Sequence, residues 1–182
     1  MIYVFLAPGF EEIEALATVD VLRRAELDVL TVGVGENFVI GSHQIPVAAD
    51  IGESDLVLDE KLEAVILPGG MPGTLNLEKS AVVQKAIDWA VKNGKLVCAI
   101  CAAPSILGHK GLLNGKNATC FPGFEKELTG AVISDKYVCR DGNIITARGM
   151  GSSIEFSLQI AELLSGTQNS EKIRASLQIY YG

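Results

Sequence analysis

The sequence predicts an α/β fold in which helices cover both faces of a mainly parallel sheet. Short apolar runs that end in Gly/Pro turns alternate with segments of helical periodicity along the chain, which is the order of elements in such sheets. Two of these runs, Ala64–Leu67 and Leu96–Ile100, are uninterrupted, as in strands buried on both faces. A length of 182 residues favours one domain, 1–182, with a core that needs no disulfide or metal.

The first half of the chain alternates strands with helices. Apolar residues at helical spacing follow the first strand. Ser80 is placed to cap a later helix, and Gly94 lies just past the end of that helix. In chain order we expect a strand at Ile2–Leu6, a helix at 13–25, a strand at 29–34, a small antiparallel excursion at 39–48, a strand at Ala64–Leu67, a helix at 80–93 and a strand at Leu96–Ile100.

The second half is expected to contain a hairpin and a long last helix. The turn of the hairpin is assigned to Asp141-Gly142, and Ser152 or Ser153 is placed to cap the last helix. The remaining elements are a helix immediately after Cys101, a strand at 118–120, hairpin strands at 137–140 and 143–147, and a helix ending at 164.

Charge and composition disfavour several classes of partner. Lys and Arg number 15 against 22 Asp and Glu, a net charge of −7, which disfavours nucleic-acid binding. No apolar run approaches the ~18 residues of a transmembrane helix. The first apolar run also lacks the preceding basic residues of a signal peptide. With four scattered cysteines, we expect a cytoplasmic protein without nucleic-acid or membrane partners.

Cys101 is the sharpest functional signal. Ligands of open parallel sheets bind beyond the carboxyl ends of the strands, and Cys101 directly follows the predicted strand Leu96–Ile100. The run Ala99-Ile100-Cys101-Ala102-Ala103 is the cysteine form of a nucleophile elbow, whose tight turn needs small neighbours. The following helix N-terminus is expected to stabilise a thiolate. The alternative is a buried strand-end cysteine without a chemical role.

The other three cysteines carry weaker signals. Cys98 and Cys101 are three residues apart, which on an extended strand is roughly 10 Å, too far for a disulfide. Cys98 is therefore expected in the core. Cys120 is either a resolving thiol beside Cys101 or a core residue, and Cys139 has no visible role.

Glu14 is the expected partner of Cys101. Glu11 and Glu12 suit the first turn of a helix whatever the function, but Glu14 lies among apolar residues. One helical turn would direct it inward over the first strand. Partial burial would raise the pKa of its carboxyl group, which could then exchange protons with the thiol.

Two glycines complete the expected site. Gly69 and Gly70 follow a buried strand and are placed to offer backbone N–H groups to an anionic oxygen. Neither a P-loop nor a dinucleotide fingerprint is present. His43 and His109 are too far apart to suggest a metal site, and each is interpreted as a surface residue. We expect no metal or organic cofactor.

Five segments carry these residues: FLAPGFEEIE at 5–14, VDVLRRA at 19–25, LPGG at 67–70, AICAAP at 99–104 and TARG at 146–149. In this order they resemble the ThiJ/PfpI family, and within it the branch of the human Parkinson-disease deglycase protein and its bacterial relatives. The resemblance implies a flavodoxin-like three-layer sandwich with a cysteine nucleophile elbow. It also implies a homodimer.

The resemblance assigns roles to individual residues. Cys101 matches the elbow nucleophile of the family, and Glu14 matches the carboxyl group that bonds to the thiolate or to its sulfinate. Gly70 and Ala102 match the backbone donors of an oxyanion pocket. Arg24 matches an arginine that approaches the site of the partner subunit.

The expected pocket also includes Gly69, Phe121 and Arg148. Phe121 stands where the family often carries a histidine. His43, at the rim, stands where relatives carry an arginine. Both departures make the pocket less basic than in those relatives.

The resemblance implies an enzyme that acts on a small aldehyde. We expect a glyoxalase or deglycase in which Cys101 attacks a 2-oxoaldehyde such as methylglyoxal, or its adduct, and Glu14 moves the protons. The alternative is a stress-responsive redox sensor or holdase chaperone in which Cys101 is oxidised. An intracellular cysteine peptidase is disfavoured because Phe121 cannot protonate a leaving amine.

Overall fold

The computed structural model describes residues 1–179 and contains a central sheet of seven strands in the order β10-β11-β7-β6-β1-β2-β5. Every neighbouring pair is parallel except β10 with β11. The predicted mainly parallel sheet is therefore confirmed. Its strands are β1 (Ile2–Leu6), β2 (Val29–Gly33), β5 (Ile51–Gly52), β6 (Ala64–Leu67), β7 (Leu96–Ile100), β10 (Val138–Asp141) and β11 (Ile144–Ala147).

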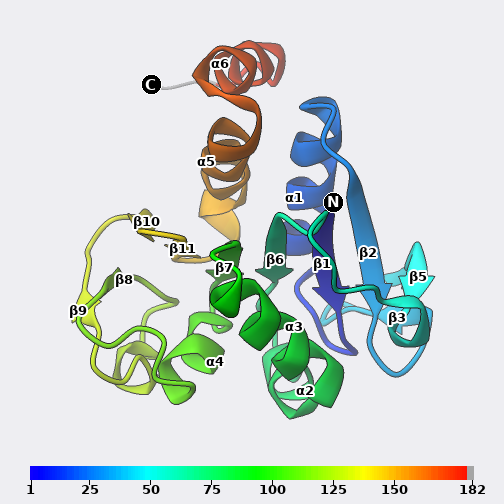
Figure 1. The fold of residues 1–182 in the computed structure, drawn as a ribbon, viewed down its shortest axis with the longest axis vertical. Helices are drawn as coiled ribbons and strands as arrows, with labels where there is room; N and C mark the ends of the chain where they lie inside the picture. Colours follow the sequence, from blue (N-terminus) through cyan, green and yellow to red (C-terminus); the bar gives the residue numbers. More distant parts are fainter. Residues whose placement is uncertain (180–182) are drawn as a thin grey trace.

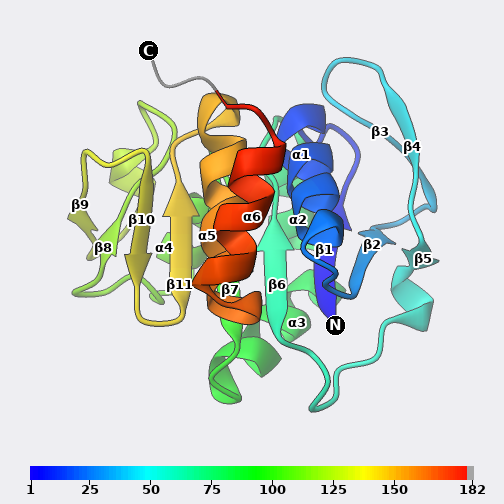
Figure 2. The same cartoon turned by 90° about the horizontal axis from the view of Figure 1, so that it is seen from above.

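Helices cover both faces of the sheet, which makes a three-layer sandwich (Figures 1 and 2). One face carries α1, α5 and α6, and the other carries α2, α3 and α4. The helices are α1 (Glu12–Arg24), α2 (Gly73–Lys79), α3 (Ala81–Lys92), α4 (Pro104–His109), α5 (Ser153–Ser165) and α6 (Thr167–Ser176).

The strand β1 shows how the sheet supports two cores. Successive side chains of a strand point to opposite faces. Tyr3 and Phe5 accordingly enter the core that includes α3 and α4, whereas Ile2, Val4 and Leu6 enter the core that includes α1 and α5. All five are buried, so both faces of the strand must be apolar. This explains why the run is uninterrupted in the sequence.

The helix boundaries follow the expected capping chemistry. The Val83 N–H donates to Ser80 Oγ at 3.3 Å at the start of α3, and Gly94 has a φ of +66° just past its end. At the start of α1, the Glu14 N–H donates to the Glu11 carboxylate at 2.7 Å. The predicted Ser80 cap is confirmed, and Glu11 is a second one.

The expected strand at 118–120 is wrong in length and in place. The observed β8 (Asn117–Ala118) is outside the central sheet and pairs with β9 (Val132–Ile133) in a separate two-stranded sheet. A hydrogen bond from the Thr119 N–H to Thr146 Oγ1, 2.9 Å long, attaches this segment to β11. Phe121 therefore reaches the site from a loop.

Two boundaries near the site also differ from expectation. The helix expected immediately after Cys101 begins later, at Pro104, because residues 101–103, including Cys101 itself, form a turn. Asp141 pairs with Ile144, so the hairpin turn is one residue later than predicted and contains Gly142 at a φ of +63°. A positive φ at the first of the two turn residues, and not at the second, is the pattern of a type II′ turn.

Several elements had no clear signal in the sequence. The helix α2 has no side-chain cap, and α6 buries only Ser170 and Ile173. The remaining short elements are β3 (Phe38–Ile40) and β4 (Pro46–Ala48), which form the small antiparallel pair expected at 39–48, and 3-10 turns at Glu53–Asp55, Glu125–Glu127 and Met150–Ser152.

No helix in the described part of the chain is long and apolar enough to cross a membrane.

Candidate active site

Cys101 occupies a sharp turn at the carboxyl end of β7. Its φ of +65° is in the left-handed region that residues other than glycine rarely adopt. The Cys101 N–H donates to the Ala147 carbonyl oxygen at 2.9 Å, and the Cys101 carbonyl oxygen accepts from the Phe121 N–H at 2.8 Å. This strained geometry is that of the predicted nucleophile elbow.

The first turn of α1 directs Glu14 inward against the elbow. The residue is only 1% exposed, and its Oε2 accepts a hydrogen bond from the Gly69 N–H at 2.8 Å. The Cys101 thiol also contacts the carboxyl group, but Oε1 lacks a well-formed hydrogen bond within the described residues. The thiol is thus held more loosely than the Gly69 amide. Glu14, Cys101 and the glycines meet at one edge of the sheet, as predicted.

The electrostatics make Glu14 a proton carrier near neutral pH. Burial raises the pKa of its carboxyl group to about 7. The contacts with Cys101 and the Gly69 N–H oppose this rise in pKa, and the negative charge of Glu11 adds to it. At neutral pH the protonated and ionised forms of Glu14 are therefore both populated, which suits a group that gives and takes protons.

The expected thiolate stabilisation by a helix is wrong. Burial and then the charge of Glu14 raise the pKa of the Cys101 thiol to about 12. The N–H groups of Gly70 and Ala102 act in the opposite direction, and α4 is short and begins only at Pro104. Because Glu14 and Cys101 interact, their titrations are coupled. Protonation of Glu14 removes the negative charge that opposes a thiolate.

Close packing explains the two glycines beside the thiol. A Cβ atom at Gly69 would lie 2.6 Å from Cys101 Cβ and 2.7 Å from Glu14 Oε2. Gly70 has a φ of +89°, and a Cβ atom there would lie 2.4 Å from the Glu11 backbone nitrogen. Only glycine fits at either position, so the backbone can approach the sulfur closely.

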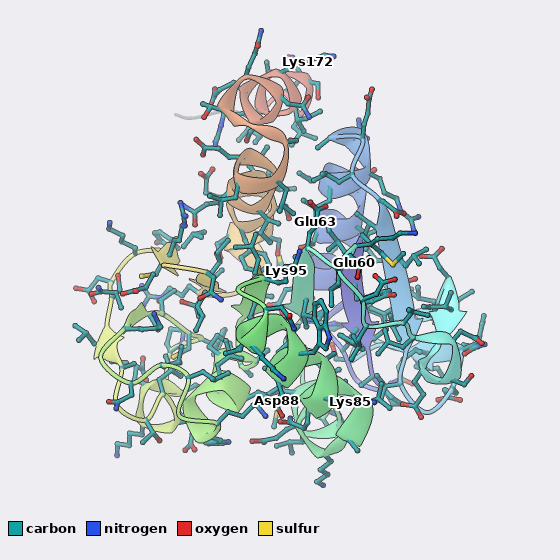
Figure 3. The ribbon with its side chains drawn as sticks, in the orientation of Figure 1. Glu60, Glu63, Lys85, Asp88, Lys95 and Lys172 are labelled. Atoms are coloured by element: carbon teal, nitrogen blue, oxygen red, sulfur yellow. The ribbon has the colours of Figure 1, made fainter. Side chains whose placement is uncertain are left out.

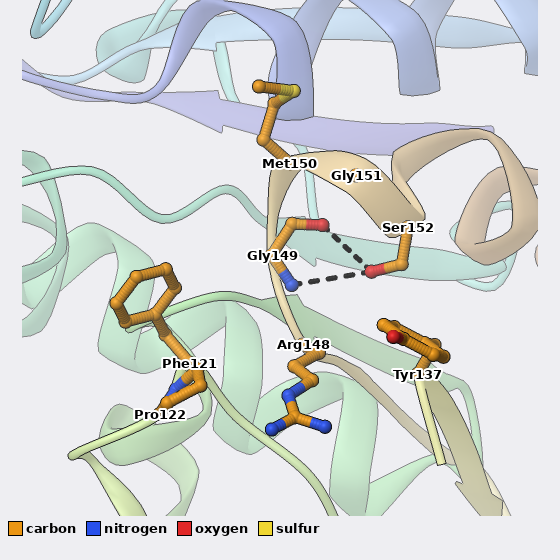
Figure 4. A pocket seen from close by; sticks show the side chains of 8 residues that line it. All are labelled: Phe121, Pro122, Tyr137, Arg148, Gly149, Met150, Gly151 and Ser152. Carbon is orange, nitrogen blue, oxygen red and sulfur yellow. Dashed lines mark hydrogen bonds between the residues drawn. The ribbon is translucent and has the colours of Figure 1, made fainter.

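A pocket of about 320 Å³ adjoins the elbow (Figure 4). Phe121 and Arg148 line it, as expected, whereas Gly69, which was expected there too, is not among its lining residues. The Phe121 N–H bonds to the Cys101 carbonyl oxygen, and Arg148 follows Ala147, whose carbonyl oxygen accepts from the Cys101 N–H. The Arg148 guanidinium lies 5.7 Å from the centre of the Tyr137 ring. Ser152, placed by the sequence at a helix cap, bonds instead to the Gly149 backbone. The lining residues are Phe121, Pro122, Tyr137, Arg148, Gly149, Met150, Gly151 and Ser152.

His43 lies beside the start of α1, where it contacts Glu12. Ligand atoms of Glu11, Glu12 and His43 lie within 4.8 Å of one another, a spacing that a metal ion could bridge. However, the Glu12 carboxylate accepts hydrogen bonds from the His43 N–H at 2.7 Å and from Ser42 Oγ at 3.2 Å. It also contacts His43 Nδ1 at 3.0 Å. These bonds account for the cluster as an anchor of the β3–β4 hairpin.

Arg24 is on the exposed side of α1. Its Nε donates to the Asp20 carboxylate at 2.7 Å, an i, i+4 pair with about half of each side chain exposed. This bond leaves the guanidinium at the surface.

The remaining cysteines are buried. Cys98 is fully buried in the core, as predicted. Cys120 belongs to the core that includes α4, whereas Cys101 packs against the opposite core. Burial raises the pKa of the Cys120 thiol to about 11, with a further rise from Glu125. This placement favours the core interpretation of Cys120 over the resolving thiol.

Comparison with known proteins identifies the family. The DJ-1/PfpI family model matches residues 1–163. The chain belongs to the DJ-1/PfpI family. The DJ-1 family protein dj-1beta of Drosophila melanogaster is 36% identical over 181 residues, which cover 98% of this chain and 96% of that protein. Its crystal structure superimposes with a TM-score of 0.92, over 99% of this chain and 98% of that chain. The predicted family and flavodoxin-like α/β fold are confirmed.

Two further DJ-1 proteins bear on function through their names. The protein called glutathione-independent glyoxalase DJR-1.2, of Caenorhabditis elegans, is 32% identical over 165 residues, which cover 90% of this chain and 87% of that protein. The structure of Toxoplasma gondii DJ-1 in an oxidised form superimposes with a TM-score of 0.93 at 34% identity, over 99% of this chain and 98% of that chain.

Proposed function

We propose that this protein is a cytoplasmic glyoxalase or deglycase that needs no metal or organic cofactor and acts on 2-oxoaldehydes such as methylglyoxal, or on their adducts. The observation that carries the proposal is the buried Glu14 carboxyl group, with a pKa of about 7, in contact with the strained Cys101 thiol. A DJ-1 relative named as a glyoxalase supports it.

The proposed reaction begins with attack by Cys101 on the aldehyde carbon. Glu14 accepts the thiol proton as the carbon–sulfur bond forms, and the backbone N–H groups of Gly70 and Ala102 hold the resulting oxyanion. Glu14 then protonates that oxygen, which gives a hemithioacetal.

The same carboxyl group completes an internal redox step. Ionised Glu14 removes the proton from the former aldehyde carbon, which gives an enediolate, and the hydroxyl proton on that carbon's oxygen passes to the oxygen of the former ketone. Glu14 then delivers its proton to the former ketone carbon, which gives the thioester of a 2-hydroxy acid. Water hydrolyses the thioester and releases the Cys101 thiol. The net reaction is methylglyoxal plus water to lactate, with the aldehyde carbon oxidised and the ketone carbon reduced.

The pocket suggests which substrates fit. Phe121, Tyr137 and Met150 give it apolar walls, and Arg148 supplies a positive charge. An apolar group of the substrate would pack between these walls, and a carboxylate of an adduct would approach Arg148.

Lactate formation from methylglyoxal in chelator-treated buffer tests the proposal. Cys101→Ser should reduce the rate to that of the buffer, because a hydroxyl in this site is a poor nucleophile at neutral pH. Cys139→Ser is the matched control, since Cys139 is buried on β10 outside the site, and it should retain activity. Equal rates for wild type and Cys101→Ser would refute the mechanism.

Oxidation of the same thiol is the second candidate function. The oxidised form of Toxoplasma gondii DJ-1 favours it, and Glu14 and the backbone donors would hold a sulfinate. Two molecules of hydrogen peroxide would convert the thiolate to the sulfinate and two molecules of water. Mass spectrometry after mild peroxide should find two added oxygen atoms on Cys101 first, and equal oxidation of Cys139 would oppose a sensor or holdase role.

A homodimer is also proposed. Ile13 and Leu16 of α1 are exposed apolar side chains, as are Phe38 and Ile40 of the hairpin that Glu12 anchors beside α1. Light scattering after gel filtration should give twice the 19.3 kDa chain mass, and a monomer would remove any role for Arg24 in a partner's site.

A further inference from the structure

His109, at the end of α4, is held between carboxylates from two other segments. Its Nδ1 lies 2.5 Å from Glu78 Oε1 in the last turn of α2, and its Nε2 lies 2.8 Å from Glu127 Oε2 in the 3-10 turn Glu125–Glu127. Carboxylates only accept hydrogen bonds, and a neutral imidazole has a single N–H. Both bonds therefore exist together only when the ring carries two protons.

The neighbouring charges leave this bridge intact. Lys110 is directed away, to the Asp88 carboxylate on α3 at 2.8 Å; Asp88 is labelled in Figure 3. The Glu125 carboxylate accepts from the Gly123 N–H. No residue of β7, which packs against α4, has a charged side chain. The charged groups on the segments around the ring are Glu78 and Lys79 of α2, Lys85, Asp88 and Lys92 of α3, and Glu125, Lys126 and Glu127.

Each of the three bridged segments also holds a peptide group of the Cys101 site. The first turn of α2, the first turn of α4 and Phe124, the residue directly before the 3-10 turn, each donate one backbone hydrogen bond to such a peptide. These bonds run from the Thr74 N–H to the Gly70 carbonyl (2.9 Å), from the Ser105 N–H to the Ala102 carbonyl (3.1 Å) and from the Phe124 N–H to the Phe121 carbonyl (3.0 Å).

We propose that His109 is a pH-dependent positioning residue: its imidazolium ties together the three segments that place Gly70, Ala102 and Phe121 around Cys101, and loss of a proton releases one of those segments. The proposal concerns the same thiol as the proposed function, but it requires only the geometry of the site and no aldehyde chemistry.

The sign of the pH effect follows from the two bonds. The hydrogen bonds to Glu78 and then Glu127 raise the pKa of His109 above its ordinary value. The stabilisation is complete below about pH 6.5, the pKa of an unperturbed histidine, and is lost as pH rises through the raised pKa. A neutral ring keeps one N–H and leaves the other nitrogen facing a carboxylate without a proton between them.

The first experiment measures the bridge itself. The chain has two histidines, so NMR titration of wild type and His109→Gln assigns both rings. His109 should titrate above pH 6.5, and Glu78→Gln and Glu127→Gln should each lower its pKa. Titration of His109 at or below pH 6.5 in the wild type would overturn the proposal.

The second experiment measures the site. Wild type and His109→Gln are compared by thermal midpoint and by the rate of Cys101 alkylation from pH 6 to 10. At pH 6 His109→Gln should melt roughly 2–4 °C lower, the shift typical of one moderate interaction lost from a chain of this size. Its alkylation rate should differ from that of wild type. Both differences should vanish above the pKa of His109.

The matched control is Glu155→Gln, which breaks the Arg174–Glu155 pair between α5 and α6. No histidine takes part in that pair, so the differences in thermal midpoint and alkylation rate between Glu155→Gln and wild type should stay constant with pH. A constant offset for His109→Gln as well would show a merely structural contact and overturn the proposal. Alkylation needs no turnover, so this result stands apart from failure of the glyoxalase assay.

Discussion

Two glutamates of the same helical turn, Glu12 and Glu14, are both buried yet have opposite electrostatics. Burial tends to raise the pKa of Glu12, but the bonds from the His43 side chain and backbone outweigh it and hold the pKa below its usual value. Glu14 receives one backbone bond, from the Gly69 N–H, and a loose contact from Cys101. Burial then dominates and raises its pKa.

The difference shows that the number of donors, rather than burial, separates an anchoring carboxylate from a proton carrier. Glu12 holds a hairpin against α1, and the hydrogen bonds that do so stabilise the ionised form of its carboxyl group. Glu14 has few hydrogen-bond donors because its carboxyl group is surrounded by the Cys101 thiol and by glycines, which have no side chains. The same helical turn thus provides Glu12, which anchors the hairpin, and Glu14, which can carry protons.

The largest expected effect separates the two carboxyl groups by activity. Glu14→Gln should lower lactate formation by about 10²–10⁴, the usual contribution of a general acid or base, because an amide cannot relay protons. Glu12→Gln should retain most of the activity. Initial rates at saturating methylglyoxal measure both, and similar losses in the two variants would abolish the distinction.

The second prediction separates the two glutamates by pH. With a pKa raised from 4.5 to about 7, native Glu14 binds its proton more tightly than the unfolded chain does. Wild type should therefore lose roughly 3 kcal/mol of stability relative to Glu14→Gln as pH rises from 4.5 to 7. Urea unfolding at a series of pH values measures this difference, and a pH-independent difference would contradict it.

The third prediction concerns the anchor. Glu12→Gln should destabilise the fold by about 1.5–3 kcal/mol at neutral pH, the range for hydrogen bonds to a charged group. Since the pKa of Glu12 is lowered, this advantage of wild type should be present above pH 4.5 and disappear as pH falls. Urea midpoints at pH 7 and pH 4 provide the comparison, and a larger advantage at pH 4 would show that the anchor is misassigned.

The smallest expected effect tests the contact between the thiol and Glu14. The Cys101 contact lowers the pKa of Glu14, so Cys101→Ala should raise that pKa further above 7 and leave the pKa of Glu12 unchanged. Carbon-13 NMR of the glutamate carboxyl groups resolves both. A fall in the pKa of Glu14 would mean that loss of burial outweighs loss of the contact.

The predictable parts of the molecule were those with local signals. The strands β6 and β7 are apolar runs with turn residues at their ends, and their order along the chain predicts a parallel sheet. Cys101 and Glu14 could be found because each lies where a strand end meets a helix. Such signals occupy a few consecutive residues and need no knowledge of distant contacts.

The parts that were missed depend on contacts between distant segments. Glu12 seemed an ordinary first-turn carboxylate, but its donors come from a hairpin about 30 residues later. Tyr137 and Met150 line the pocket from a loop and a 3-10 turn, with no periodicity to reveal them. The bridge at His109 joins residues 31 and 18 positions away, and no spacing rule links such positions.

The backbone conformation of Cys101 lowers the stability of the fold at the position that carries the reactive thiol. A non-glycine residue in the left-handed region costs on the order of 1 kcal/mol or more, whereas glycine adopts it freely. Selection for folding alone would favour a glycine at the tip of this turn. The cysteine keeps the conformational cost in every folded copy, with or without substrate, so the resting protein is permanently weakened at the one position where a thiol is useful.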